Sequence, residues 1–437
     1  MSRQGWFLLS VAAIVLCALF LRWAAVNQTE INGPLRKDAG DYYRYAYNLK
    51  HFGVFSRSDE GFQSDRSPTP DALRPPGYPV FIAAFLDDGK DFSFMPRVLM
   101  AQALLGTATV LVYLLIFRLY LQPVLAVVAA GFAAISPHLI NSTVYVLTEC
   151  LFTFLLGLGL LALILGMKRR SPIVILGGGF AIAASLLTRG TTLYLVLFLL
   201  PLFFIHYVCP RQQRAVALAS LVVPIVLAHA AWSFRNLHAI GESSDPTLTA
   251  NFLQHGMYIN MMYEGRPETY GYPYRVDPLS DEMQGKPGRV LAEMGKRFLD
   301  EPARYAAWIL VGKPMLFLSW NLTESVGDAF VYAPITTPYG YSTPFLITHG
   351  ISKALHAPMM GLAIVAMIVV LWRAAKGEDV GVAPLVLSAV MLYFLMLHAL
   401  GSPFPRYSIP TRPIAYGLAM LPLQWLWLLI SDPVKSQ

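Results

Sequence analysis

The sequence predicts an all-α polytopic membrane protein. Hydrophobic residues make up 56% of the 437 residues and charged residues only 14%, whereas about a quarter of the residues in a soluble domain are charged. The mean hydropathy is +0.52. Long apolar runs recur, and many approach the ~20 residues that a helix needs to cross a bilayer. We therefore expect a single domain, residues 1–437, with about ten transmembrane helices.

The first apolar run covers residues 6–26. It follows Arg3 and resembles a signal peptide, but its apolar core is long and no small-residue cleavage site precedes the next loop. We expect an uncleaved signal-anchor whose N-terminus is cytoplasmic. Residues 78–86 are apolar but far too short to span, which predicts an interfacial helix.

Nine further apolar runs are predicted to span. They are residues 98–120, 124–139, 144–167, 172–187, 191–208, 215–234, 354–372, 382–400 and 414–430. Several are shorter than a full crossing, so their ends must extend into the flanks or the bilayer must adapt. Residues 302–320 carry Lys313-Pro314 in the middle and Arg304 at one edge. This segment is predicted to be re-entrant or to lie on the outer surface.

The basic residues give the orientation. Alternate connections carry Arg118, Lys168, Arg169, Arg170, Arg211, Arg214, Arg373 and Lys376. Since short cytoplasmic loops are enriched in Lys and Arg, both termini are predicted inside, with outer loops at about 27–97 and 235–343. The net charge of +7 comes from these short clusters and not from one basic face, so nucleic acid is not an expected partner.

Cysteine usage gives no metal or disulfide signal. Cys17, Cys150 and Cys209 lie in or beside apolar runs without pairing or ligand spacing. No His, Asp or Glu cluster has the spacing of a metal site. We therefore expect no cofactor, and nothing in the sequence indicates a divalent cation.

The first outer loop carries two carboxylates, Asp38 and Asp41. They are three positions apart, so they share one side of any helix formed there. Two explanations remain open for this pair: a functional site, or simply a cap of the following helix.

Further charges fall at the other outer connections: Arg74, Glu149, Arg189 and Arg406. Charges near membrane depth are costly and imply a partner or a site. Each one singly is explained equally well by an ion pair or a snorkelling anchor. Pairing of Glu149 with one of the arginines is the rival explanation, and a lipid phosphate could meet the others as a bidentate partner.

These groups suggest a reaction at the outer face. Nucleotide sugars are absent there, but a lipid-linked sugar donor has its phosphate at headgroup level. A carboxylate could take the proton of an acceptor hydroxyl, and arginines could stabilise the departing phosphate. The predicted catalytic residues are Asp38 and Asp41. The predicted donor-phosphate and substrate-binding residues are Arg74, Tyr78, Glu149, Arg189, Arg406 and Tyr407.

Several short motifs occur in a recognisable order. They are Asp38-Ala39-Gly40-Asp41-Tyr42, Gly53-x-Phe55-Ser56, Arg74-Pro75-Pro76-Gly77-Tyr78-Pro79, Leu147-Thr148-Glu149, Leu187-Thr188-Arg189 and Pro405-Arg406-Tyr407. Together they resemble the bacterial C-type (GT-C) membrane glycosyltransferases related to protein O-mannosyltransferases and the lipid A aminoarabinose transferase, a glycosyltransferase family 39-like group. The resemblance extends over most of the chain.

This resemblance implies a GT-C-like bundle with periplasmic loops and interfacial helices in the bacterial inner membrane. It also implies a polyprenyl-phosphate sugar donor and inverting transfer of a hexose or pentose to an envelope acceptor at the periplasmic face. Asp38 matches the first-loop Asp near the acceptor. Ala39 replaces the Glu of the eukaryotic Asp-Glu pair, so either Asp38 or Asp41 is the base. The acceptor class, whether lipid, glycan or protein, stays open.

Two other functions remain as alternatives. A transporter or flippase of lipid-linked glycans would need charges at mid-span depth and paired broken helices in two halves. An outer-face glycan polymerase or ligase would share the large outer loops but lacks this order of motifs. Sequence reasoning favours the transferase because the charges gather at one membrane edge.

Overall fold

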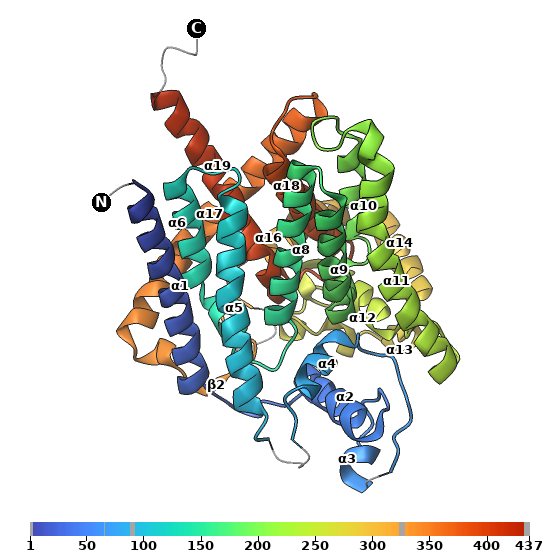
Figure 1. Cartoon of the computed structure of the whole chain (residues 1–437). Helices are drawn as coiled ribbons and strands as arrows, with labels where there is room; N and C mark the ends of the chain where they lie inside the picture. The colour runs from blue at the N-terminus through green and yellow to red at the C-terminus, as the bar shows by residue number, and fades with distance from the viewer. Residues whose placement is uncertain (1–2, 65, 88–91, 323–327, 432–437) are drawn as a thin grey trace.

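The computed structural model describes residues 3–64, 66–87, 92–322 and 328–431, and it is a helical bundle (Figure 1). In the described residues, seven helices are long and apolar enough to cross a membrane, and three shorter apolar segments lie at 123–135, 172–188 and 190–204. Together they match the ten predicted spans. The helices of these apolar segments are α1 (Arg3–Gln28), α5 (Met95–Phe117), α6 (Pro123–Ile135), α8 (Glu149–Arg169), α9 (Pro172–Thr188), α10 (Leu195–Leu199), α11 (Arg214–Ile240), α17 (Thr343–Ala375), α18 (Val382–Leu400) and α19 (Arg412–Ser431).

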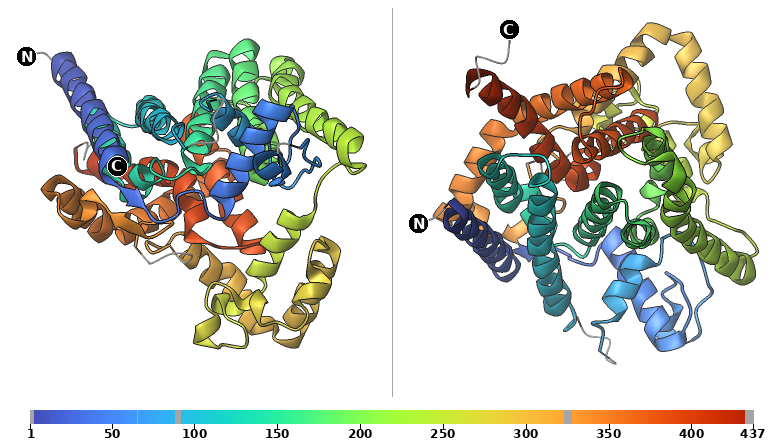
Figure 2. Two further views of the ribbon diagram at one scale, coloured as in Figure 1. Left: turned by 90° about the horizontal axis from the view of Figure 1, so that it is seen from below. Right: turned by 45° about the horizontal axis from the view of Figure 1, so that its top comes forward.

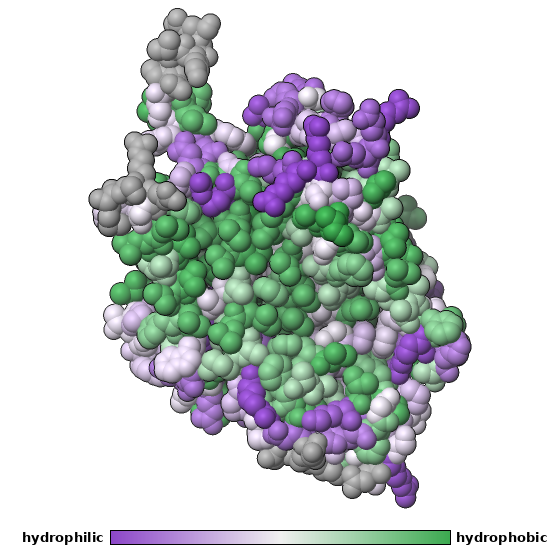
Figure 3. Space-filling view, in the orientation of Figure 1, coloured by the Kyte–Doolittle hydropathy of each residue, from purple (hydrophilic) through white to green (hydrophobic). Residues whose placement is uncertain are grey.

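The bundle has two distinct ends. α1 begins and α19 ends at the same end, which we call the termini end (Figure 1). The first-loop helices lie at the opposite end, which we call the loop end; they are α2 (Asp38–Phe52), α3 (Glu60–Ser64) and α4 (Gly77–Ala83). Figure 3 shows a broad apolar belt between the two ends, with hydrophilic side chains above and below it. This is the surface expected of a protein surrounded by lipid.

The segment after α11 forms a separate lobe beside the long helices (Figure 2, left). Its small core contains Ala250, Met257, Tyr258, Met283 and Val290. The helices and turns of the lobe are α12 (Thr247–Gly256), η4 (Ile259–Met261), η5 (Pro267–Thr269), η6 (Pro273–Arg275), α13 (Ser280–Met283) and α14 (Pro287–Asp300).

The next segment does not cross the bundle. It consists of α15 (Pro302–Ala307), η7 (Trp308–Gly312) and α16 (Lys313–Phe317). Trp308 packs with Phe404, and Lys313 Nζ donates to the carbonyl of Ala399, 2.7 Å away, at the end of α18. The chain leaves at the same end, because the Ser319 carbonyl accepts from Arg412 at the start of α19. These contacts hold the segment beside the connection between α18 and α19, which agrees with the predicted non-crossing segment.

Four predicted boundaries differ from the structure. α8 begins at Glu149, not at residue 144, because residues 143–148 form a non-helical loop. α17 begins at Thr343 instead of residue 354, because Pro344 favours a helix start at that position. Polar residues interrupt the apolar run between the two positions. The 191–208 span is broken into η1 (Gly190–Thr192), α10 and η2 (Leu200–Phe204), since Pro201 cannot donate a helical hydrogen bond. The 124–139 span divides at Pro137, which opens α7 (Pro137–Asn141).

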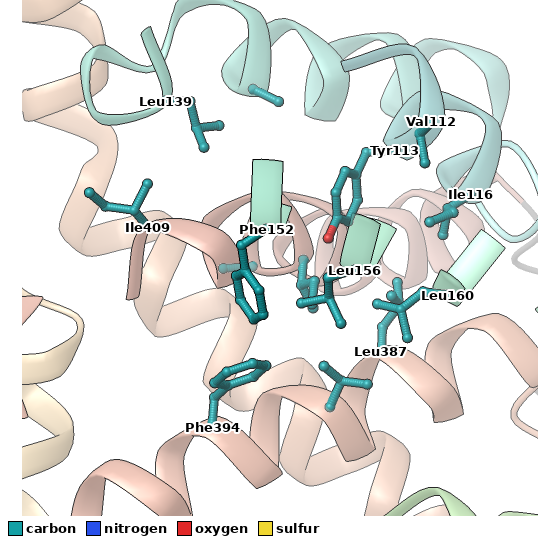
Figure 4. Close-up of a cluster of buried hydrophobic side chains, with 14 of the residues drawn as sticks. Val112, Tyr113, Ile116, Leu139, Phe152, Leu156, Leu160, Leu387, Phe394 and Ile409 are labelled. Carbon is teal, nitrogen blue, oxygen red and sulfur yellow. The ribbon is translucent and has the colours of Figure 1, made fainter. Parts of the chain in front are cut away.

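Close packing of α8 against α9 fixes their loop ends. A Cβ on Gly159 would lie 2.7 Å from Ile182, and one on Gly178 would lie 2.9 Å from the backbone nitrogen of Leu163. Small residues at such contacts let membrane helices approach closely enough for van der Waals packing to hold them. Figure 4 shows the apolar core beside this pair, where Phe152 of α8 faces Phe394 of α18.

The first loop is tied to the chain before α17 by a short antiparallel pair of strands. β1 (Glu30–Ile31) pairs with β2 (Pro334–Thr336). The last short helix, η9 (Pro405–Thr411), leads directly into α19. Thus the segments that carry the predicted site residues all start or end at the loop end of the bundle.

Candidate functional site

Asp38 and Asp41 share the guanidinium of Arg74. Arg74 Nη2 lies 2.6 Å from Asp38 Oδ1 and 3.0 Å from Asp41 Oδ2, and its Nε also donates to Asp41 Oδ2 at 3.3 Å. Both carboxylates lie in the first turn of α2, so one face of the helix presents them to the returning end of the loop. Pro75 and Pro76 follow Arg74 and stiffen this return.

The helix-cap explanation does not describe these carboxylates. The cap position of α2 is Lys37, which makes no side-chain cap hydrogen bond and has a φ of 51°. Asp41 Oδ1 instead accepts from Arg44 Nη2 at 2.8 Å. A left-handed backbone at a non-glycine residue costs energy and is often found at functional sites. Here it sets the start of the helix directly before Asp38.

Glu149 forms a second cluster with arginines from two distant connections. It is the first residue of α8 and is only 2% exposed. Arg406 Nε of η9 donates to Glu149 Oε1 at 2.7 Å, and Arg189 Nη1, at the end of α9, lies 3.4 Å from the same oxygen. The positive end of the α8 dipole further favours a carboxylate at this position.

The two clusters are joined through Arg406. Its Nη1 lies 3.6 Å from Asp38 Oδ2, so opposite charges alternate without a gap. We call these residues the charge chain: Asp41, Arg74, Asp38, Arg406, Glu149 and Arg189. The rival explanation, in which Glu149 pairs with one arginine, covers only part of the arrangement. Glu149 contacts both Arg406 and Arg189, and Arg74 pairs with the two aspartates.

Exposure distinguishes the two aspartates. The side chain of Asp38 is 34% exposed and that of Asp41 13%, while Glu149 is buried. Burial raises the pKa of Asp38, but Arg74 and Arg406 outweigh this effect and hold that pKa below its ordinary value of 3.8. Asp38 is therefore an ionised carboxylate within reach of solvent, whereas Asp41 is enclosed by Arg74 and Arg44.

The two tyrosines of the predicted site lie in different surroundings. Tyr407 is half-buried, with Arg189 Cζ 4.8 Å from the centre of its ring, so it belongs to the surface of the site. Tyr78 is completely buried, and its hydroxyl donates to Gln102 Oε1 at 2.8 Å. This burial contradicts the predicted contact between Tyr78 and a substrate.

Further cations beside the charge chain were overlooked in the sequence. Arg44 is three residues after Asp41, a spacing that places both on one helix face. Arg36 and Lys37 directly precede Asp38, and neither forms an ion pair with any residue that the structure describes. With these residues included, cations outnumber the carboxylates of the charge chain and Asp59, which lies 3.5 Å from Arg44. The region can therefore attract an anion.

A narrow crevice runs beside Glu149, and its walls leave no room for a water molecule. It is lined by His138, Asn141, Ser142, Tyr145, Leu147, Glu149, Ala329, Val331 and Ile409. Glu149 Oε2 and Asn141 Oδ1 are buried and lack a hydrogen-bond partner among the described residues. No cluster of three His, Cys, Asp or Glu that could hold a metal is found in the described part of the chain.

Two other buried arginines serve the fold instead of the site. Arg22 of α1 donates to the carbonyls of Ala133 and Ala134 in α6. Arg412 donates to His138 Nδ1 at 2.7 Å and to the Ser319 carbonyl at 3.0 Å. Each guanidinium is paired with neutral acceptors that tie helices together, so neither one joins the charge chain.

Comparison with known proteins gives a likeness of fold. No protein-family model and no curated protein matches the chain. The structure is similar to the apo oligosaccharyltransferase of Archaeoglobus fulgidus, with a TM-score of 0.54 and 14% identity over 100% of this chain and 53% of that chain. A structure of the archaeal oligosaccharyltransferase AglB from the same organism, in complex with an inhibitory peptide and a dolichol-phosphate, gives a TM-score of 0.53 and 14% identity over 100% and 52% of the two chains.

The chain therefore spans about half the length of these solved structures. ArnT from Cupriavidus metallidurans, bound to undecaprenyl phosphate, aligns over 99% of this chain and 80% of its own, with 14% identity and a TM-score of 0.35. The likeness to the oligosaccharyltransferase shows that the chain has a GT-C-like fold, and it confirms the predicted class of all-helical, polytopic membrane protein.

The burial of Glu149 makes its charge essential for stability. Glu149→Gln removes the nearer carboxylate of the buried Arg406 and leaves it the more distant one of Asp38, which should destabilise the protein by about 3 kcal/mol. We expect a clearly lower melting temperature in detergent. The double variant Glu149→Gln/Arg406→Gln should regain part of this loss because it removes both charges.

Glu301→Gln is the matched control. It breaks a pair with Arg304 in which both side chains are more than half exposed, so its melting temperature should stay close to that of the wild type. Equal melting temperatures for Glu149→Gln and Glu301→Gln would contradict a stabilising role of the charge chain.

Proposed function

We propose that the chain is a membrane glycosyltransferase that moves a sugar from a polyprenyl-phosphate donor to an envelope acceptor. The observation that carries this proposal is the charge chain: an ionised, accessible Asp38 lies 3.6 Å from Arg406, at one end of a bundle with a GT-C-like fold. The complex of AglB with a dolichol-phosphate supports a lipid-linked donor. The acceptor is an envelope lipid, glycan or protein.

Asp38 is assigned as the general base. Its Oδ2 takes the proton of an acceptor hydroxyl as that oxygen attacks the anomeric carbon of the donor. The bond between the anomeric carbon and the phosphate oxygen breaks at the same time, and polyprenyl phosphate leaves with the electron pair. Attack opposite the leaving group inverts the anomeric centre.

Arg189 and Arg406 are assigned to the donor phosphate. Negative charge grows on the phosphate as the sugar leaves, and guanidinium groups placed there stabilise the transition state more than the bound donor. Arg189 is 16% exposed and only loosely paired with Glu149, at 3.4 Å. Arg74, whose Nη2 and Nε are already bonded to both aspartates, instead fixes the position and charge of Asp38.

The gathering of charges at one end favours a transferase over a flippase. A flippase needs polar groups along a path across the bilayer. The charge chain lies instead at the loop end, beside helices α2 and α4. The sugar transferred is a hexose or a pentose.

Asp38→Asn tests the base directly. Purified protein is incubated with candidate polyprenyl-phosphate sugars and an envelope acceptor, and loss of donor is followed. Turnover should fall about 10²–10⁴-fold in Asp38→Asn with little change in donor binding. Asp41→Asn should lose less, because Asp41 is enclosed and serves to hold Arg74. The opposite ranking would transfer the role of base to Asp41, and full activity of both variants would exclude it for either.

Donor affinity tests the arginines. With a non-transferable polyprenyl-phosphate sugar, Arg189→Ala and Arg406→Ala should bind the donor about tenfold or more weakly, the loss expected for a charge-assisted hydrogen bond. Lysine at either position should restore part of the affinity, because a point charge cannot reproduce the bidentate fork. Arg304→Ala, which removes an exposed arginine in a pair with Glu301, should bind like the wild type. Unchanged affinity at both site positions would show that they only anchor helices.

The loop end is proposed to face the periplasm or the cell exterior of a bacterial inner membrane. Single cysteines at Lys376, exposed at the termini end, and Tyr270, 43% exposed in the outer segment, test this in a chain with Cys17 replaced by serine. A membrane-impermeant thiol reagent added outside should label position 270 and not position 376. The reverse pattern would place the charge chain on the cytoplasmic side.

A further inference from the structure

Gln102 is a buried polar residue in the middle of an apolar helix. It lies in α5 and is 0% exposed. Its Nε2 donates to the carbonyls of Thr143, at 3.1 Å, and Tyr145, at 2.9 Å. Both carbonyls belong to the non-helical loop that leads to Glu149, where unpaired backbone groups would be costly inside a membrane.

The other side of the same amide binds α4. Gln102 Oε1 accepts from the hydroxyl of Tyr78 at 2.8 Å. The Tyr78 ring also meets the ring of Tyr42 edge-on, with centres 5.1 Å apart, and Tyr42 directly follows Asp41. Gln102 therefore bridges the loop that carries Glu149 and the short helix that follows Arg74.

α4 has little freedom to shift in any other direction. A Cβ on Gly77 would lie 2.8 Å from the carbonyl of Leu187 and from Thr188 Oγ1, so α4 is pressed against the last turn of α9, just before Arg189. Arg74, three residues before α4, is bonded to Asp38 and Asp41 of α2. The position of α4 thus determines how three parts of the charge chain lie relative to each other: Arg74 with its two aspartates, Arg189, and Glu149.

We propose that Gln102 is a positioning residue that sets the distance between the Arg74–Asp38 pair and the Glu149–Arg406 pair through its hydrogen bond to Tyr78. This inference rests on the proposed transferase function. A base and a leaving-group site must be aligned within a fraction of an ångström, and a displacement of about 1 Å can reduce turnover about 10²-fold. Gln102 touches neither a substrate nor a reacting atom, and it acts only through the two ion pairs whose separation it sets.

Two variants remove the link at different points. Tyr78→Phe deletes only the hydroxyl, and Gln102→Leu deletes the whole amide. Gln424→Leu is the matched control, because Gln424 of α19 likewise links two segments, with Nε2 donating to the Tyr120 carbonyl and Oε1 accepting from the Gln122 amide. That glutamine is only partly buried, and it lies towards the termini end, away from the charge chain.

The expected result is a fall of about tenfold in kcat for Tyr78→Phe, with KM for the donor changed less than about twofold. Gln102→Leu should behave similarly, and the double variant should be no worse than the worse single variant because both delete one link. Gln424→Leu should keep the wild-type kcat. Wild-type kcat in correctly folded Tyr78→Phe, or an equal fall in Gln424→Leu, would overturn the proposal.

A distance measurement tests the positioning without any activity. Spin labels are placed at Val80 of α4, 51% exposed, and Leu158 of α8, 38% exposed, with Cys17 replaced by serine. The distribution of distances should be narrow in the wild-type background and in Gln424→Leu, and broader or displaced in Tyr78→Phe and Gln102→Leu. Identical distributions in all four would overturn the proposal. A wild-type protein that consumes no polyprenyl-phosphate sugar would instead refute the proposed function, and the distances would still decide the role of Gln102.

Discussion

The pairing of charges at the loop end is the constraint on which the rest of the structure depends. Removing Glu149 from water is costly unless cations replace the lost hydration, and Arg406 and Arg189 supply them. Those arginines come from connections far away in sequence, so η9 and the end of α9 must lie against the start of α8. The close glycine contacts between α8 and α9 and the buried hydrogen bonds of Arg412 follow from the same requirement.

The sequence predicted the fold class, because a helix that crosses lipid needs a long run of apolar residues. Seven helices in the described residues meet that requirement, and three shorter apolar segments lie where the other spans were predicted. Their ends were less accurate. Residues 143–148 are apolar enough to be predicted as helix. Local backbone hydrogen bonds and the amide of Gln102 satisfy part of their backbone without a helix. α17 was predicted too short because residues outside the bilayer need not be apolar to remain helical.

The site was predicted in part for a similar reason. Charged residues near membrane edges are rare enough to be noticed, so Asp38, Arg74, Glu149, Arg189 and Arg406 were selected individually. Which of them pair depends on the distances in space between the connections. Spacing along the sequence does not give those distances. Tyr78 was assigned to the substrate because its motif ends the loop. In the structure the side chain is buried, and its hydroxyl binds Gln102 instead.

The position of η9 has a consequence for biosynthesis. A ribosome delivers the first-loop aspartates, then Arg74, Glu149 and Arg189, long before residues 405–411 leave the exit tunnel. Until then Glu149 has the 3.4 Å contact with Arg189 to offset its desolvation, and Asp38 has Arg74 but not Arg406. The last hairpin, α18 with α19, therefore supplies the final cation of the loop end. A nascent chain that stops before this hairpin contains every carboxylate of the site but not Arg406.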